Sequence, residues 1–215
     1  NNKEKAMPQT SLKILEILRD GSNFQWYVIP LLSFVFYVYT VEVEKKNWNL
    51  VLAGLAFWGA DWINEIINSL VFHFSGYAPI WGTPGESAFV ILAGLNIEIM
   101  FMFAVAGIVW TKMLLPDKNA KILGVNNRWF IAIAGSAFSV FVEILLNQVN
   151  ALTWEYTWWN TSAPWLIFIF GYLTFFIVAF WVYDMEDFKK KLITVGSIWG
   201  VVIVSLILFI SIGWI

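Results

Sequence analysis

The chain has 215 residues, of which 60% are hydrophobic, 19% are aromatic and only 13% are charged. A soluble domain of this length could not bury so much apolar surface, so the composition excludes an ordinary soluble protein. The formal charge of −2 gives no sign of a nucleic-acid partner, and a chain without cysteine has no disulfides, thiol catalysis or cysteine-ligated metals. The sequence therefore predicts an all-α, polytopic integral membrane protein.

The first 23 residues form a segment distinct from the rest of the chain. In "SLKILEILRD", helical spacing places apolar side chains on one face and Lys13, Glu16 and Arg19 on the other. We expect a short amphipathic helix on the membrane surface, although a simple lead-in turn fits the pattern equally well. The predicted organisation is an interfacial segment over 1–23, followed by a transmembrane helical domain over 24–215.

Six apolar stretches in this second part are long enough to cross a bilayer. Short polar breaks separate them, which indicates separate helices and not one buried core. The predicted spans are residues 24–43, 48–73, 87–112, 129–149, 163–183 and 192–214. We therefore expect a bundle of about six transmembrane helices, located in the cell membrane and surrounded by membrane lipids.

Basic residues divide the connecting loops into two kinds. Lysine and arginine gather in the loops near residues 45, 118 and 190, whereas the loops near 78 and 157 contain neither. By the positive-inside rule, the first three loops are cytoplasmic and the other two are exoplasmic. This assignment places the N-terminal segment outside despite its own basic residues, which would need a further preceding span or an unusual placement of that segment.

Spans two to five contain a candidate internal repeat. The stretch "EIIN" beginning at Glu65 matches "EILLN" beginning at Glu143, and sixteen residues later each copy reaches a tryptophan, Trp81 or Trp159. Each copy then meets a glycine in its next predicted span. These matches predict a parallel repeat of two hairpins around an axis along the membrane normal. Chance similarity between two apolar hairpins is the alternative.

Acidic residues lie in the interiors of three predicted spans, and no lysine or arginine lies in a span interior. Asp61 and Glu65 share one helix face because they are four residues apart, and Glu98 and Glu143 lie in the next two spans. At a rise of about 1.5 Å per residue, the three glutamates lie roughly 9–15 Å beneath the exoplasmic surface. Ionised carboxylates are costly there, so we expect a shared polar chamber in which at least one acid is protonated and all four are candidate catalytic groups.

Asparagines and tryptophans near these acids are the candidate substrate-binding residues. They are Asn64, Asn68, Asn96, Asn147, Trp62, Trp81, Trp154, Trp158 and Trp159. Amides extend the polar stripes, and indole faces stabilise a carbocation. The simpler explanations are hydrogen bonding between helices and an interfacial aromatic belt. The single histidine, His73, has no paired ligand motif, so we expect no metal site.

Several functions suit such a chamber. An enzyme would use one acid to protonate or hydrate an alkene in a lipid-soluble substrate, and a second carboxylate to take a proton back. A transporter would move protons or another cation through the same acids. An accessory subunit that binds lipids or partner helices is a third hypothesis, and the pair Gly196 and Gly200 would allow a homo-oligomer.

The stretch "VEILLNQVNALTWEYTWWNTSAPWLIFIFGY" resembles the membrane-bound carotenoid hydratases in the order of an acid, an aromatic patch, a proline and a Gly-aromatic pair. The tandem hairpins are similar to those of the related small lycopene cyclases. The resemblance implies a lyase or isomerase that acts on an isoprenoid without a cofactor, with Glu65 and Glu143 as the acids of the two repeats. A "PExxW"-like cyclase signature is absent, which puts ring closure in doubt.

Overall fold

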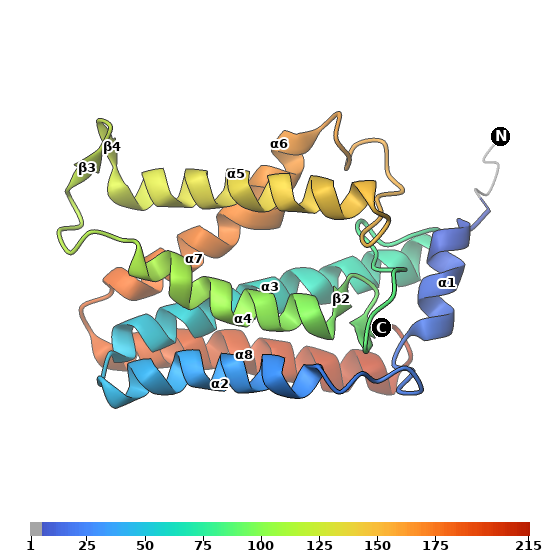
Figure 1. Ribbon diagram of the computed structural model, residues 1–215, viewed down its shortest axis with the longest axis horizontal. Coiled ribbons are helices and arrows are strands. Elements are labelled where there is room, and N and C mark those ends of the chain that lie inside the picture. Colours follow the sequence, from blue (N-terminus) through green and yellow to red (C-terminus); the bar gives the residue numbers. More distant parts are fainter. Residues whose placement is uncertain (1–5) are drawn as a thin grey trace.

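The computed structural model describes residues 6–215 as a bundle of long helices with two small β-hairpins (Figure 1). The helices are α1 (Gln9–Ile17), α2 (Val28–Glu44), α3 (Trp48–Ser75), α4 (Ile97–Lys112), α5 (Asn127–Gln148), α6 (Pro164–Leu166), α7 (Thr174–Asp184) and α8 (Phe188–Ser211), with a π-helix η1 (Ile167–Leu173) joining α6 to α7. The strands are β1 (Val90–Leu92), β2 (Leu95–Asn96), β3 (Lys121–Ile122) and β4 (Val125–Asn126).

Four helical segments of residues 6–215 are long and apolar enough to cross a membrane. They are α3, α5, the continuous segment α6–η1–α7, and α8. Helices α2 and α4 have 17 and 16 residues, fewer than the about 20 that a bilayer crossing normally uses. The all-α membrane bundle is therefore confirmed, whereas only four of the six predicted spans are shown as candidates.

The third predicted span, 87–112, is wrong in its first part. Residues 90–96 form an antiparallel hairpin, and α4 begins only at Ile97. The side chain of Asn96 caps this helix by accepting a hydrogen bond from the backbone N–H of Ile99 at 2.8 Å. Hydrophobic periodicity alone does not separate a short buried strand from a buried helical turn, so the sequence pattern missed this boundary.

A second hairpin of the same design precedes α5. The stretches "ILAGLN" (91–96) and "KILGVN" (121–126) both fold as strand, turn and strand, and both end in an asparagine that caps the next helix. The hairpins lie at opposite ends of the bundle, so α4 and α5 run in opposite directions (Figure 1). This likeness relates α4 to α5, whereas the repeat predicted from the sequence relates α3 to α5 and stays a prediction.

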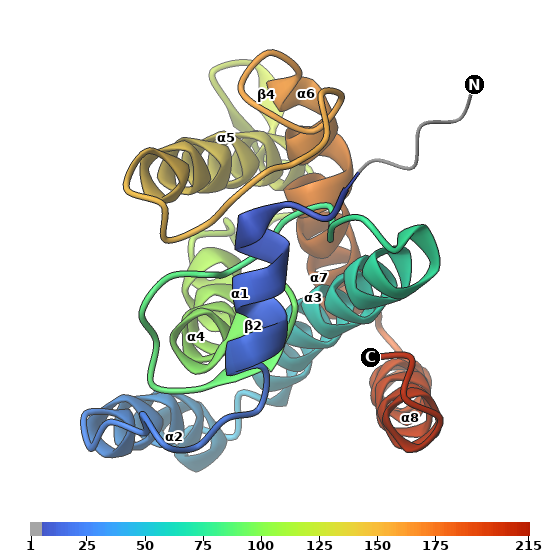
Figure 2. The ribbon, with the colours of Figure 1, turned by 90° about the vertical axis from the view of Figure 1, so that its right-hand side faces the viewer.

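Helix α1 lies across the end of the bundle at which α4 begins (Figure 2). It forms where the sequence predicted an amphipathic helix, and the side chain of Ile14 is buried against Phe72 and Ala93. Part of its apolar face is thus covered by protein. Its contact with a membrane surface stays a prediction, and residues 1–5 of the predicted segment lie outside the described residues.

Charged side chains tie the helices together at the opposite end. The buried carboxylate of Glu42 lies 2.5 Å from the ammonium of Lys112, and Arg128 pairs with Asp184 at 2.8 Å. Lys191, expected in a loop, lies within α8 with a buried side chain that donates to the side chain of Asn49. These residues belong to the end with the basic loops, whose cytoplasmic location stays a prediction.

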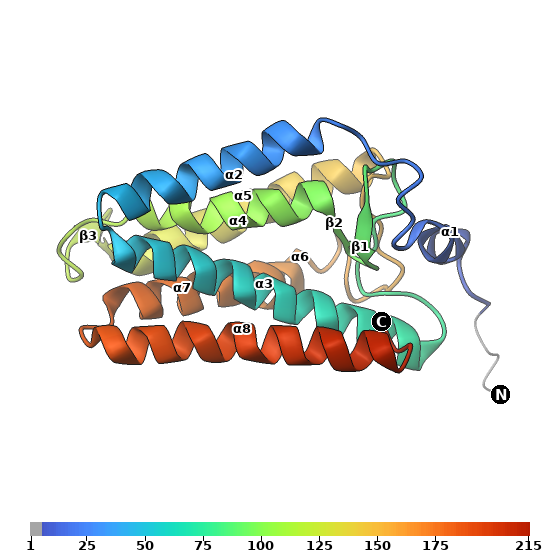
Figure 3. The same ribbon diagram turned by 90° about the horizontal axis from the view of Figure 1, so that it is seen from below.

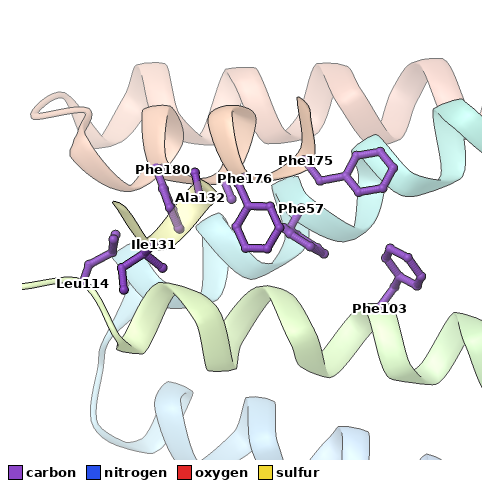
Figure 4. Close-up of a cluster of buried hydrophobic side chains, with 9 residues drawn as sticks. Phe57, Phe103, Leu114, Ile131, Ala132, Phe175, Phe176 and Phe180 are labelled. Carbon is purple, nitrogen blue, oxygen red and sulfur yellow. The ribbon is translucent and has the colours of Figure 1, made fainter. Parts of the chain in front are cut away.

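An aromatic core cluster fills the space between α3, α4, α5 and α7 (Figure 4). The ring of Phe57 packs edge-on against Phe176, with 5.1 Å between centroids. Gly135 of α5 lets α7 approach, because a Cβ there would lie 2.3 Å from the Phe176 ring. Helix α8 lies along α3 on one side of the bundle (Figure 3), and no atom of residues 6–215 lies within 4 Å of a Cβ built at its Gly196 or Gly200.

Candidate acidic site

Three carboxyl groups and one tyrosine line a small cavity between α3, α4, α5 and η1. The polar groups are those of Asp61, Glu65, Glu143 and Tyr172, and the walls include Trp81, Gly94, Phe103, Trp159 and Phe175. We call this space the acidic cavity. Its volume is about 40 Å³, enough for a few water molecules or a small ion.

On the α3 side of the acidic cavity, two carboxyl groups each have one oxygen without a hydrogen-bond partner among the described residues. Asp61 and Glu65 are 2% and 4% exposed, and their four-residue spacing places them on one face of the helix. Oδ2 of Asp61 and Oε2 of Glu65 are buried and have no hydrogen-bond partner among the described residues. Buried polar atoms are normally paired, so these oxygens mark a place for a proton, a water molecule or a ligand.

The loop after α3 holds an indole against Glu65. Nε1 of Trp81 donates to Oε1 of Glu65 at 2.8 Å. Behind this pair, the buried Asn68 accepts a hydrogen bond from the backbone N–H of Ile80 and donates one to the carbonyl of Trp81. The amide thereby fixes the loop in the position that aims the indole at the acid.

The turn of the β1–β2 hairpin closes over the same acid. A Cβ at Gly94 would lie 2.4 Å from Nδ2 of Asn68 and 2.6 Å from Oε2 of Glu65. Only glycine therefore lets the turn reach this depth without displacing the carboxylate. The sequence placed Gly94 inside a helix, and the signal that could have indicated a turn is the pair of "LAGLN" and "ILGVN" stretches.

The α5 side of the cavity repeats this arrangement with other residues. Nε1 of Trp154 donates to Oε1 of Glu143 at 2.8 Å, and Tyr172 lines the same cavity as this carboxyl group. Trp154 thus does for Glu143 what Trp81 does for Glu65. The predicted repeat paired Trp81 with Trp159 instead, and it did not identify Tyr172.

The two loops that carry these indoles are joined directly. Gly82 and Thr153 exchange backbone hydrogen bonds of 3.0 and 2.8 Å in a short antiparallel bridge. Next to it, the rings of Trp81 and Trp159 stack with centroids 5.4 Å apart. The bridge and the stacked pair hold both loops beside the acidic cavity.

A π-helical turn shapes the wall opposite α3. The seven residues of η1 include Gly171 and Tyr172, which both line the acidic cavity. Asn64 of α3 donates a hydrogen bond to the carbonyl oxygen of Phe170 at 2.9 Å, which binds the two helices together. Such turns are frequent at functional sites, and no residue pattern in the sequence predicted this one.

An apolar groove adjoins the acidic cavity and opens on the surface of α3 and α6–η1–α7. Its volume is about 410 Å³, and its lining includes Ile63, Ile67, Phe170 and Val178, with Asn64 and Thr174 as polar members. Trp81, Trp159 and Phe175 line both spaces. The two spaces thus share these three aromatic side chains in their walls.

Glu98 lies outside the acidic cavity. Its carboxylate accepts hydrogen bonds from the hydroxyls of Tyr27 and Ser87 and from the backbone N–H of Ala88. The reason is the late start of α4, which leaves Glu98 in the first turn at the end of the bundle. There it ties the start of α2 to the loop before β1, and the predicted chamber with Glu65 and Glu143 does not include it.

The other predicted substrate-binding residues lie outside the acidic cavity. Asn147 donates to the carbonyl of Leu152, within the loop that follows α5. Trp62 packs in a cluster with Leu92, Leu95 and residues at the far end of the chain, and it does not line the acidic cavity. Trp158 is exposed and contacts Trp159 edge-on. No group of three His, Asp or Glu residues within 6–215 is arranged to hold a metal ion.

Comparison with known proteins identifies a family model and relatives of this chain. A model described as an uncharacterized membrane protein family matches residues 8–211. An uncharacterized protein of Archaeoglobus fulgidus is 55% identical over 201 residues, which are 94% of this chain and 95% of the relative. A second uncharacterized protein of that organism is 49% identical over 53 residues, 24% of this chain and 95% of that protein.

No solved structure was found to match. These matches support the membrane nature of the protein, and they give no support to the resemblance to carotenoid hydratases or lycopene cyclases. The chain belongs to the uncharacterized membrane protein family whose model spans residues 8–211.

Proposed function

We propose that the protein transfers protons to and from a lipid-soluble alkene, and that the carboxyl groups of the acidic cavity do this work. The observation that carries the proposal is the wall shared by the acidic cavity and the apolar groove. An unsaturated chain, such as an isoprenoid, that lay in the groove would contact Trp81, Trp159 and Phe175, which also line the acidic cavity. Movement of the stacked indoles would join the two spaces.

The residues of the cavity suit acid–base chemistry. No lysine or arginine among residues 6–215 lines it, and neighbouring carboxyl groups without a cation supply both a proton donor and a proton acceptor. In the proposed reaction, Glu65 donates a proton to one alkene carbon, and the resulting carbocation either loses a proton to Glu143 or first adds water and then loses one. The faces of Trp81 and Trp159 stabilise the cation.

The size of the acidic cavity favours a second candidate, the movement of protons or a small cation across the membrane. A volume of about 40 Å³ accommodates water or an ion, whereas a hydrocarbon chain needs the groove. Acidic residues within membrane helices commonly mark such pathways. In this alternative, the transported species binds to the carboxyl oxygens of Asp61 and Glu65 that have no hydrogen-bond partner among the described residues.

Deuterium exchange distinguishes the two candidates. Purified protein is incubated in D₂O with a lipid extract, and mass spectrometry then detects deuterium in unsaturated lipids. We expect incorporation with wild type and none with Glu65→Gln, whereas the matched control Glu98→Gln, outside the cavity, retains it. Incorporation that survives Glu65→Gln would contradict the enzyme proposal. Proton flux into liposomes that Glu65→Gln abolishes, without any exchange into lipid, would favour transport.

A further inference from the structure

We infer that a second site, between α1, α3 and the end of α8, binds a membrane lipid with an anionic phosphate headgroup. A cavity of about 330 Å³ lies there. Its residues have no part in the proposed acid–base chemistry, so this site can exist whether or not that chemistry does. We call it the Arg19 cavity.

Most of the wall of the Arg19 cavity is apolar. Leu15 and Leu18 come from the α1 region, Phe72 from α3 and Ile210 from α8. At its rim, Trp214 stacks on His73 with 5.7 Å between ring centroids. Aromatic rings of this kind are enriched at the level of lipid headgroups, where they have one apolar side and one wet side. The walls therefore suit an acyl chain whose headgroup lies at the rim.

The guanidinium of Arg19 gives the cavity a positive charge. Its Nη2 donates one hydrogen bond, to the backbone carbonyl oxygen of Ile215, and within residues 6–215 no aspartate or glutamate pairs with it. The remaining donors are available to an anion. Arginine binds phosphate through two parallel hydrogen bonds, so it is well suited to a lipid phosphate.

The backbone of Arg19 is held in an uncommon conformation. Its φ is +56°, in the left-handed region that residues other than glycine rarely adopt. A 2.8 Å hydrogen bond from its N–H to the carbonyl of Val90 anchors it to β1. The side chain is thus presented to the cavity from a fixed point of the fold and not from a loose chain end.

A buried hydroxyl provides an independent sign of a ligand. Ser69 lines the Arg19 cavity, is only 5% exposed, and its Oγ has no hydrogen-bond partner among the described residues. A buried hydroxyl normally has a partner, and a lipid headgroup or glycerol oxygen in the cavity would supply one. A free phosphate ion would satisfy Arg19 but leave the apolar walls uncovered, which favours a lipid.

Competition between lipids tests the inference. The full chain is reconstituted in nanodiscs with equal amounts of phosphatidylglycerol and phosphatidylcholine, and native mass spectrometry counts the lipids that remain bound. We expect phosphatidylglycerol to be retained preferentially, and Arg19→Gln to reduce that preference about tenfold, as the loss of a charge-assisted hydrogen bond implies. The matched control is Lys13→Gln, which removes a charge from α1 at a residue that does not line this cavity.

A second variant tests the cavity without altering charge. Leu15→Trp replaces a half-exposed side chain and fills the cavity, so it should lower retention of both lipids while the protein remains folded by gel filtration. Equal retention of the two lipids by wild type, or equal losses in Arg19→Gln and Lys13→Gln, would overturn the inference. Displacement of the bound lipid by millimolar inorganic phosphate would show that the site is an ion site and not a lipid site.

Discussion

Trp81 donates a hydrogen bond from its indole nitrogen to Glu65 at 2.8 Å, and Trp154 donates an equivalent bond to Glu143. Each acid occupies a different helix, and each indole comes from the loop that follows that helix. The acidic cavity is therefore built from two similar units, α3 with its loop and α5 with its loop, which meet at the bridge between Gly82 and Thr153.

The first prediction concerns the indole that orients Glu65. Trp81→Phe retains an aromatic ring but removes the N–H donor, so Glu65 should lose its fixed orientation. We expect the proton-transfer activity, measured as deuterium incorporation or proton flux, to fall by about 10- to 100-fold, equivalent to about 1.4–2.7 kcal/mol. Trp62→Phe makes the same chemical change outside the acidic cavity and should have little effect on activity. Equal losses in both variants would contradict a specific role for the Trp81 bond.

A second prediction concerns the turn over the acids. Gly94→Ala places a methyl group 2.4–2.6 Å from Asn68, Trp81 and Glu65, so these groups must shift. We expect a loss of about 1–3 kcal/mol in the free energy of unfolding, together with a loss of activity. Gly196→Ala is the control, because no described residue lies within 4 Å of its added carbon. Thermal unfolding in detergent compares the stability of both variants with that of wild type. An unchanged melting temperature for Gly94→Ala would show that the turn does not close over the acid.

The third prediction separates a structural acid from the acids of the cavity. Glu98→Ala removes the acceptor for Tyr27, Ser87 and Ala88, so it should destabilise the protein by about 1–3 kcal/mol. Activity per folded molecule should stay near that of wild type. Glu65→Gln should give the opposite pattern, with stability retained and activity lost. A Glu98→Ala protein that is stable but inactive would indicate that Glu98 has a catalytic role and not a structural one.

The fourth prediction tests the groove in a chain that has no native cysteine. A spin label at Ile67→Cys, on the exposed surface of the groove, should collide with dissolved oxygen more often than with a water-soluble nickel chelate. A label at Leu123→Cys, in the β3–β4 turn and 89% exposed, should collide with the nickel chelate more often than with oxygen. A strong nickel effect at residue 67 would mean that the groove faces water and would count against a lipid-soluble substrate.

The fifth prediction tests sidedness. If the basic loops are cytoplasmic, a membrane-impermeant maleimide added to intact cells should label Ser162→Cys, in the loop after α5, but not Leu123→Cys until the cells are opened. Both positions are exposed in the fold, so burial does not explain a difference. The reverse pattern would invert the predicted orientation.

The sequence alone determined the class of protein and the location of most helices. Its apolar runs, interrupted by short polar breaks, predict a helical membrane bundle because an α-helix pairs its backbone polar groups within the segment, as the bilayer core requires. The helical spacing of Asp61 and Glu65 also placed them on one face of α3, as the fold has them. These are local properties, set by composition and by the helical period.

Only the tertiary structure decided which of these residues meet. The start of α4 depends on a hairpin whose strands carry the same apolar residue types as a helix, and that boundary moved Glu98 to the end of the bundle. Tyr172 and Trp154 lie near Glu143 because a π-helical turn and a cross-loop bridge bring together segments separated along the chain. No periodicity encodes such pairings, because they arise from packing between segments and not from the order of residues within one.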